Sequence, residues 1–288
     1  MPDKYKAVWV SHSSSSDFLK CPRSYFLKNI YKDPKTGNKM TLMSPPLALG
    51  QAVHNTLENL ANLPTDKRFE KSLIDRFEDE WKKISGDKGG FYDSKIEKDY
   101  KERGMEMIKR VQKMKAPLNR LAIKIDMDLP NYWLSEEDNI ILCGKVDWLE
   151  YLPDTDSVNI VDFKTGKSKE DEKSLQLPIY LLLVKNCQKR NVEKASYWYL
   201  ESDDELTERE LPDPDEAREK VLAVAKKMKL ARQLKSFNCP KGDDGCMFCT
   251  PFEKLIKGEG KLVGTDEIRR DVYTLEKSDD ENRDGVLM

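Results

Sequence analysis

The sequence lacks a long hydrophobic run and an excess of charge of either sign. No apolar stretch in its 288 residues reaches the roughly 18 that a membrane-spanning helix needs. The first residues also lack the apolar core of a secretory signal, so we expect a cytoplasmic protein without a membrane partner. A net charge of −2 is not the basic excess of many nucleic-acid binders. Any contact with a nucleic acid must therefore come from a local basic patch. One candidate is residues 20–39, which hold six basic side chains and one acid, although such runs are also typical of an ordinary solvated surface.

Six cysteines are present, and in a reducing compartment they are more often thiols or metal ligands than disulfides. Three of them, Cys239, Cys246 and Cys249, fall within eleven residues and include a Cys-x-x-Cys pair among turn residues. This spacing indicates a metal site whose fourth ligand lies elsewhere in the chain. Cys143 and Cys187 stand in apolar strand and helix contexts, where we expect small core residues.

Hydrophobic periodicity divides the chain into helices and strands. The helical period appears, with capping and turn residues between, in residues 13–21, 47–61, 69–84, 95–115, 172–188 and 213–234. A period of two or a β-rich run appears in residues 123–129, 139–151, 158–164 and 195–200. Turn residues at 153–157 predict that the second and third strands form a hairpin. The order predicts an α/β fold, a small mixed sheet flanked by helices.

The same patterns predict one domain over residues 1–270. The lysine- and glutamate-rich helices within 65–116 look like a helical insertion, and 236–256 carries the late cysteines. The polar residues 271–288 are expected to form a disordered tail.

Acidic and basic side chains gather at the predicted hairpin. Asp162 and Lys164 share one side of their strand while Phe163 turns to the core, and Asp147 of the paired strand can lie beside Asp162. Two adjacent carboxylates repel unless a cation joins them, and Mg²⁺ prefers such oxygens. The lysine could orient or deprotonate a water molecule or stabilise a phosphate. A nitrogen from His54 would also suit Mn²⁺. Taken singly, Asp162 and Lys164 are more typical of a surface ion pair, and His54 is more typical of a structural histidine. Taken together, the residues favour the metal site.

Several short motifs resemble one known family. They are Ser13-x-Ser15-x-x-Phe18-x-x-Cys21-Pro22-x-x-Tyr25-Phe26, Gly50-x-x-x-His54, Gly144-x-x-Asp147, Asp162-Phe163-Lys164-Thr165-Gly166 and Gln176-x-x-x-Tyr180. Together they resemble the RecB-like and AddB-like branch of the PD-(D/E)xK nucleases, to which the CRISPR-adaptation nucleases are related. The resemblance covers most of the chain and is weakest between about residues 65 and 115 and beyond 260.

The resemblance implies a restriction-endonuclease-like core and a role for each matched residue. The metal ligands would be His54, Asp147, Asp162 and the backbone carbonyl of Phe163, holding Mg²⁺ or Mn²⁺. Lys164 would be the catalytic lysine, and Gln176 and Tyr180 would support the substrate.

The resemblance also supplies a fourth cysteine. Cys21 would join Cys239, Cys246 and Cys249 around a 4Fe–4S cluster, and a structural Zn²⁺ on the same thiolates stays open. Relatives usually carry a cysteine about six residues after the Cys-x-x-Cys pair, where this chain has Leu255, so Cys239 would take its place.

These features predict a metal-dependent nuclease, an exonuclease acting on single-stranded DNA or duplex ends. DNA repair, recombination and CRISPR adaptation are all suitable settings, with a separate helicase or a recombination or CRISPR protein as a partner. Three alternatives remain: a catalytically inactive nuclease-fold subunit that binds DNA or assembles a larger complex, an RNA-directed enzyme, and a zinc module without catalysis.

Overall fold

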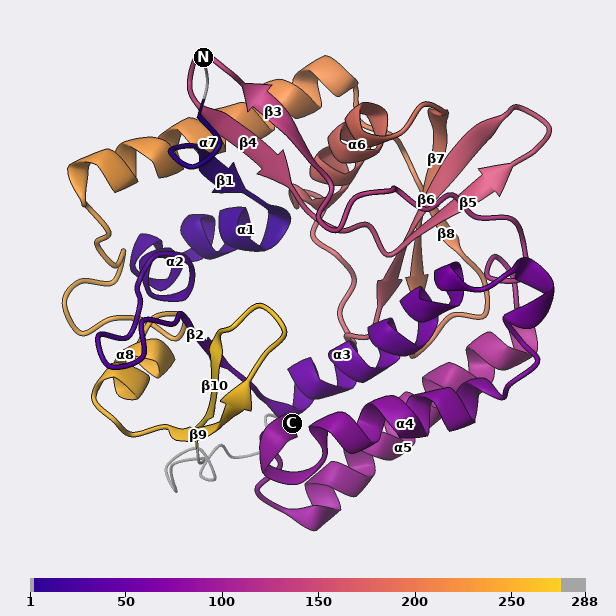
Figure 1. The fold of residues 1–288 in the computed structure, drawn as a ribbon, viewed down its shortest axis with the longest axis horizontal. Helices are drawn as coiled ribbons and strands as arrows, with labels where there is room; N and C mark the ends of the chain where they lie inside the picture. Colours follow the sequence, from indigo (N-terminus) through magenta and orange to yellow (C-terminus); the bar gives the residue numbers. More distant parts are fainter. Residues whose placement is uncertain (1–2, 276–288) are drawn as a thin grey trace, which may run out of the picture.

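The computed structural model describes residues 3–275, in which small β-sheets are surrounded by helices (Figure 1). The α-helices are α1 (His12–Lys20), α2 (Pro22–Asn29), α3 (Pro45–Glu58), α4 (Leu73–Ile84), α5 (Ser94–Met114), α6 (Gln176–Cys187), α7 (Pro214–Leu234) and α8 (Thr250–Ile256). Short 3-10 helices are Asn59–Asn62, Thr65–Lys67 and Gly86–Gly89. The predicted α/β class, with small mixed sheets flanked by helices, is confirmed.

Three sheets are formed within the described residues. One has the order β5-β6-β7-β8, another β1-β4-β3, and the third β2-β10-β9. Their strands are β1 (Val8–Val10), β2 (Met40–Leu42), β3 (Asn131–Ser135), β4 (Ile140–Cys143), β5 (Trp148–Leu152), β6 (Ser157–Lys164), β7 (Asn191–Tyr199), β8 (Thr207–Arg209), β9 (Lys261–Thr265) and β10 (Asp271–Thr274). Strands β5 and β6 pair antiparallel as the predicted hairpin, and β6 pairs with β7 in parallel.

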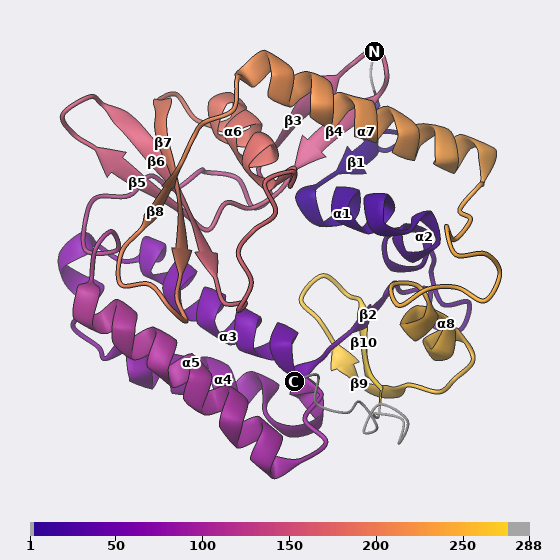
Figure 2. The same cartoon turned by 180° about the vertical axis from the view of Figure 1, so that it is seen from behind.

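Two hydrophobic clusters cover the two faces of the four-stranded sheet. Val161 and Phe163 of β6 belong to the cluster built with α3, α4 and α5. Val158 and Ile160 belong to the other, which includes residues of α6 and α7. Both views of the ribbon place these helix groups on opposite sides of the sheet (Figures 1 and 2). Because side chains alternate along a strand, Asp162 lies on the α6 side and Phe163 on the α3 side.

A third cluster joins the early and late parts of the chain. Strand β10 pairs in parallel with β2, and α8 lies beside α2, so indigo and yellow segments are neighbours in Figure 1. Cys21, Leu27 and Met40 pack there with Phe252 and Leu255. The early helices are thus held against the segment that carries the late cysteines.

Two predicted strands are wrong in extent. Residues 123–129 form no strand; one isolated bridge, from Ala122 to Glu150, lies directly before them. The apolar residues that alternate in this segment do not form one buried face, because Met127 and Leu129 are each 40% exposed. The segment predicted as one strand over 139–151 is divided into β4 and β5, which belong to different sheets.

The predicted tail begins too early. Residues 271–274 form β10, in which Asp271 is buried and accepts hydrogen bonds from Thr36 (2.6 Å) and Asn38 (2.9 Å). This polar segment is ordered because its charge has partners and its backbone pairs on both sides. The rest of the predicted tail, residues 276–288, lies outside the described residues. Among the helices of residues 3–275, none combines the length and apolar character needed to cross a membrane.

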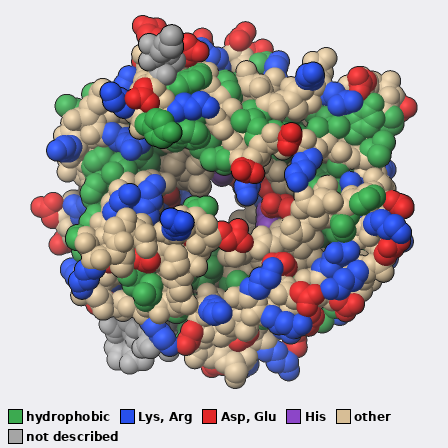
Figure 3. Space-filling model, viewed as in Figure 1, with side chains coloured by type: hydrophobic (Ala, Val, Ile, Leu, Met, Phe, Trp, Pro, Cys, Tyr) green, Lys and Arg blue, Asp and Glu red, His purple; other side chains and the backbone are tan. Residues whose placement is uncertain are grey.

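The molecule is hollowed at its centre. Figure 3 shows an opening in this view, with histidine side chains in purple at its edge. The ribbon in the same view places α1, α3 and the β10 segment around it (Figure 1).

Candidate active site and cysteine cluster

The β5–β6 hairpin brings the predicted carboxylates together. Trp148 pairs with Val161, so the next pair outward is Asp147 opposite Asp162 at the end of the hairpin. Asp147 lies just before β5, and its Oδ2 accepts a hydrogen bond from the backbone N–H of Phe163 at 2.8 Å. This bond fixes the carboxylate against the neighbouring strand. The Phe163 side chain is buried in the core, as the alternation predicts.

Helix α3 places an imidazole and a further carboxylate beside Asp147. The Nδ1 atom of His54 lies 3.1 Å from Glu58 Oε1 and 3.5 Å from Asp147 Oδ2. His54 and Glu58 are four residues apart, which puts them on one side of the helix. One ligand atom from each of His54, Glu58 and Asp147 lies within 4.8 Å of the others.

A second group surrounds the ammonium of Lys164. Its Nζ lies 2.9 Å from Asp162 Oδ2 and 2.7 Å from Glu170 Oε2, and it donates to Gln176 Oε1. Gln176 at the start of α6 also donates from Nε2 to Asp162 Oδ1 at 2.8 Å and contacts the Tyr180 hydroxyl at 3.3 Å. One amide therefore positions both the lysine and the aspartate, while Tyr180 steadies that amide.

Burial and like charges perturb the acids of the site. Burial, with Asp162 and Glu58 nearby, raises the pKa of Asp147 to about 8, although His54 opposes this rise. Burial also raises the pKa of Asp162 against the attraction of Lys164. Two carboxyl groups with raised pKa values in one place are costly to ionise, and a cation between them removes that cost.

The two bases of the site are held in their charged forms. Burial lowers the pKa of His54, but Asp147 and Glu58 outweigh it and raise the value to about 9. Burial likewise lowers the pKa of Lys164, and Asp162 with Glu170 reverses the direction. Lys164 is therefore an ammonium at neutral pH. It is suited to stabilising negative charge or orienting a water molecule, and not to accepting a proton.

The donor set fits a hard divalent cation. One imidazole nitrogen and several carboxylate oxygens are ligands that suit Mg²⁺ and Mn²⁺. Asp162 Oδ2 is buried and accepts no well-directed hydrogen bond, since its contact with Lys164 is only an ion pair. Of the sequence-predicted ligands, His54 and Asp147 lie in the compact group, while Asp162 is turned towards Lys164. The role of the Phe163 carbonyl stays a prediction.

Three residues of the site were missed as functional residues. Glu58 carries a sequence signal, because it stands four residues after His54 in a helical pattern. Glu170 lies in the connection between β6 and α6, where no periodicity marks it. Tyr197 of β7 places its ring 4.9 Å from Lys164 Nζ, and this neighbour depends on the parallel β6–β7 pairing.

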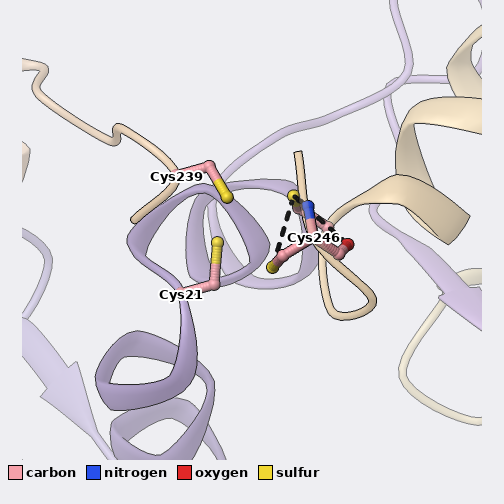
Figure 4. A group of neighbouring side chains, drawn as sticks. Cys21, Cys239 and Cys246 are labelled. Carbon is pink, nitrogen blue, oxygen red and sulfur yellow. Dashed lines mark hydrogen bonds between the residues drawn. The ribbon is translucent and has the colours of Figure 1, made fainter. Parts of the chain in front are cut away.

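The four predicted cysteines converge at the third hydrophobic cluster. The sulfur atoms of Cys21, Cys239, Cys246 and Cys249 all lie within 4.8 Å of one another. Figure 4 shows the labelled Cys21, Cys239 and Cys246 directing their sulfurs into one space. Cys21 precedes α2 and the other three precede α8, so the cluster links both parts of the chain. Burial raises the pKa of Cys143, which lies apart as the predicted core residue.

Comparison with known families agrees with this arrangement. A family model of the PD-(D/E)XK nuclease superfamily matches residues 9–251, which include both the carboxylate–lysine site and all four clustered cysteines. The chain therefore belongs to the PD-(D/E)XK nuclease superfamily, and its α/β architecture is consistent with the restriction-endonuclease-like fold of that class. A search of curated proteins found no match.

Glu58 gives a direct test of the metal group. We expect Glu58→Gln to weaken Mn²⁺ binding by about tenfold, because it loses a negative charge that either binds the ion or orients His54. The measurement is calorimetric titration of metal-free protein. Glu106→Gln removes one charge from an exposed glutamate that forms an ion pair with Lys109, away from the site, and should change nothing. Equal affinities of the two variants would show that Glu58 has no part in binding.

Metal affinity should depend on pH. In the metal-free site the raised pKa values of Asp147 (about 8) and His54 (about 9) mean that protons occupy the atoms a cation needs. Protons and metal compete, so affinity for Mg²⁺ should rise from neutral pH and level off above about pH 9, with protons released on binding. Calorimetry in buffers of different ionisation enthalpy measures that release. Constant affinity without proton release would contradict the assignment.

Proposed function

We propose that this chain is a divalent-metal-dependent deoxyribonuclease that acts as an exonuclease on single-stranded DNA or duplex ends. The observation that carries the proposal is the meeting of two groups at one strand end: His54, Glu58 and Asp147 on one side, and Asp162 with Lys164 on the other. A structural ion pair does not require two largely buried carboxylates, Asp147 and Asp162, whose ionisation burial opposes.

The chain's own residues would divide the work. Mg²⁺ or Mn²⁺ held by His54, Asp147, Glu58 or Asp162 would supply charge stabilisation and a more acidic bound water. Lys164 would bring an ammonium to the phosphate as negative charge develops there. Gln176 would hold the side chains of Lys164 and Asp162 in position relative to each other, and Tyr180 would support the Gln176 amide.

Space for a nucleic acid lies next to these groups. A cavity of about 560 Å³ is lined by Asp147 and Glu58 and also by the polar donors Asn59, Asn62 and Lys145. The central opening in Figure 3 supports a path for a single strand with a free end. A strand that must enter by its end favours exonuclease over internal cleavage.

The wider setting rests on the motif resemblance. We place the chain in the RecB-like and AddB-like branch, in DNA repair, recombination or CRISPR adaptation. A separate helicase or a recombination or CRISPR protein would be its partner. All six cysteines are free, which agrees with a reducing cytoplasm. We further propose that residues 1–270 act as one domain with the helical insertion at 65–116 and the cysteine segment at 236–256.

Cleavage of matched linear and circular single-stranded DNA tests the proposal. With Mg²⁺ or Mn²⁺, the protein should release short products from end-labelled linear DNA and leave the circle and an RNA of the same sequence intact. Without metal, or in Asp147→Asn, cleavage should stop.

Other outcomes identify the alternatives. Cutting of the circle would identify an endonuclease, and preferential loss of the RNA would identify an RNA-directed enzyme. Binding of DNA without cleavage in either metal would favour the catalytically inactive assembly subunit.

A further inference from the structure

The cysteine cluster is compact, and its size limits what it can hold. All four sulfurs lie within 4.8 Å of one another, and the Cys246 and Cys249 sulfurs are 3.8 Å apart. Four thiolates around a single zinc ion, with Zn–S bonds of about 2.3 Å, form a tetrahedron with edges of about 3.8 Å. The observed separations approach this value without rearrangement of the backbone.

A four-iron cluster has a different requirement. Each thiolate binds a different iron at a corner of a cube of iron and sulfide, so the sulfurs stand outside the cube. They must then be further apart than four thiolates that share one ion. Sulfurs that nearly touch, as those of Cys246 and Cys249 do, leave no room for such a cube between them. The 4Fe–4S expectation therefore does not fit the observed site.

The backbone around the sulfurs supports a small closed site. Ser24 N–H donates to Cys21 Sγ at 3.4 Å, Lys241 N–H to Cys239 Sγ at 3.4 Å, and Cys246 N–H to Cys249 Sγ at 3.1 Å. Such bonds fix thiolate positions around a metal.

Gly245 and Leu255 fill space around the cysteine cluster. Gly245 has a φ of 82°, and a Cβ there would lie 3.2 Å from Cys249 Sγ, so the turn can wrap closely round that sulfur. Leu255, which occupies the position of the relatives' usual late cysteine, is 5% exposed and packs as a core residue in the same cluster.

We propose that Cys21, Cys239, Cys246 and Cys249 bind one Zn²⁺ in a closed tetrahedral structural site. All four positions are filled by protein thiolates, as in structural zinc centres, and no open position remains for a substrate. The ion clamps the start of α2 to the segment before α8. The ion pair of Arg23 with Glu253 (3.1 Å) crosses the same junction. This assignment does not depend on the nuclease proposal.

Metal analysis of the full-length wild-type protein tests the site. The protein is purified anaerobically from cells supplied with both iron and zinc, and its metals are counted by mass spectrometry. X-ray absorption at the zinc edge then gives the ligands. We expect one tightly bound zinc per chain, a colourless solution, and a single shell of four sulfurs at about 2.3 Å without a neighbouring metal. Iron in the protein, with the visible absorption of a thiolate–iron centre, would overturn the proposal, as would a protein without tightly bound metal.

Two cysteine variants distinguish this site from zinc bound elsewhere. Cys239→Ser should lose the stoichiometric zinc and show a lower melting temperature, whereas Cys187→Ser, outside the cluster, should keep both. If Cys239→Ser cannot be obtained folded, the sulfur count of the wild-type absorption spectrum still decides. A shell containing nitrogen or oxygen would place the zinc at the His54 site and contradict the assignment.

Discussion

Replacing Lys164 by alanine is expected to lower kcat for DNA cleavage by about a thousandfold while leaving metal binding intact. Removal of one preorganised charged donor from a developing negative charge costs about 10²–10³ in rate. Contacts with Asp162, Glu170 and Gln176 hold the Lys164 ammonium in place. The compact metal group of His54, Glu58 and Asp147 does not include it, so the ion should still bind.

The split between kcat and KM separates this role from substrate binding. If the ammonium acts only as charge develops, kcat and kcat/KM should fall together with little change in KM. Lys167→Ala is the matched control, because Lys167 is an exposed lysine three residues further along and loses the same charge. A rise in KM alone would make Lys164 a binding residue. Equal cleavage by both variants and wild type would assign the activity to a contaminant.

The strands and the helix at the centre of the site could be predicted from local sequence patterns. Residues 158–161 are apolar except for Asn159, and turn residues precede them, so the β5–β6 hairpin and the opposition of Asp147 and Asp162 followed from a period of two. Helical spacing likewise placed His54 on a helix. Both patterns are local, and local geometry determines them.

Contacts between residues far apart in the sequence were harder to predict. Residues 144–147 separate β4 from β5, and the two strands belong to different sheets, although the sequence pattern predicted one continuous strand. Strands of three residues, such as β1 and β2, are too short for a detectable period. Glu170 and Tyr197 reach Lys164 only through the folded positions of a loop and a parallel neighbour. The convergence of Cys21 with the late cysteines was expected from the family resemblance, since spacing alone left the fourth ligand open.

Replacing Arg68 by alanine is expected to lower the free energy of unfolding by about 4 kcal/mol. Arg68 is 4% exposed and lies in residues 65–116, the segment that we propose as a helical insertion. Its guanidinium donates to the backbone carbonyls of Leu60 (3.1 Å), Leu63 (3.3 Å), Leu118 (2.9 Å) and Arg120 (2.6 Å). A buried carbonyl left without a donor costs about 1–3 kcal/mol, and some of the four will recover by binding water.

The consequence of this substitution should extend from the insertion to the active site. The guanidinium carbon of Arg68 lies 4.9 Å from the ring of Trp148, which directly follows Asp147. Urea unfolding measures the stability, and Lys67→Ala, at an exposed neighbour that pairs with Glu70, should change it by less than about 0.5 kcal/mol. Arg68→Lys should recover only part of the loss, because an ammonium cannot span carbonyls on both sides as the planar fork does. If Arg68→Ala were as stable as the Lys67 control, water would be satisfying all four carbonyls. The insertion would then be held by its other contacts, which include apolar packing against α3 and the ion pair of Arg103 with Glu201. A loss in Arg68→Ala accompanied by weaker Mg²⁺ binding would instead show that this arginine transmits the packing of the insertion to Asp147.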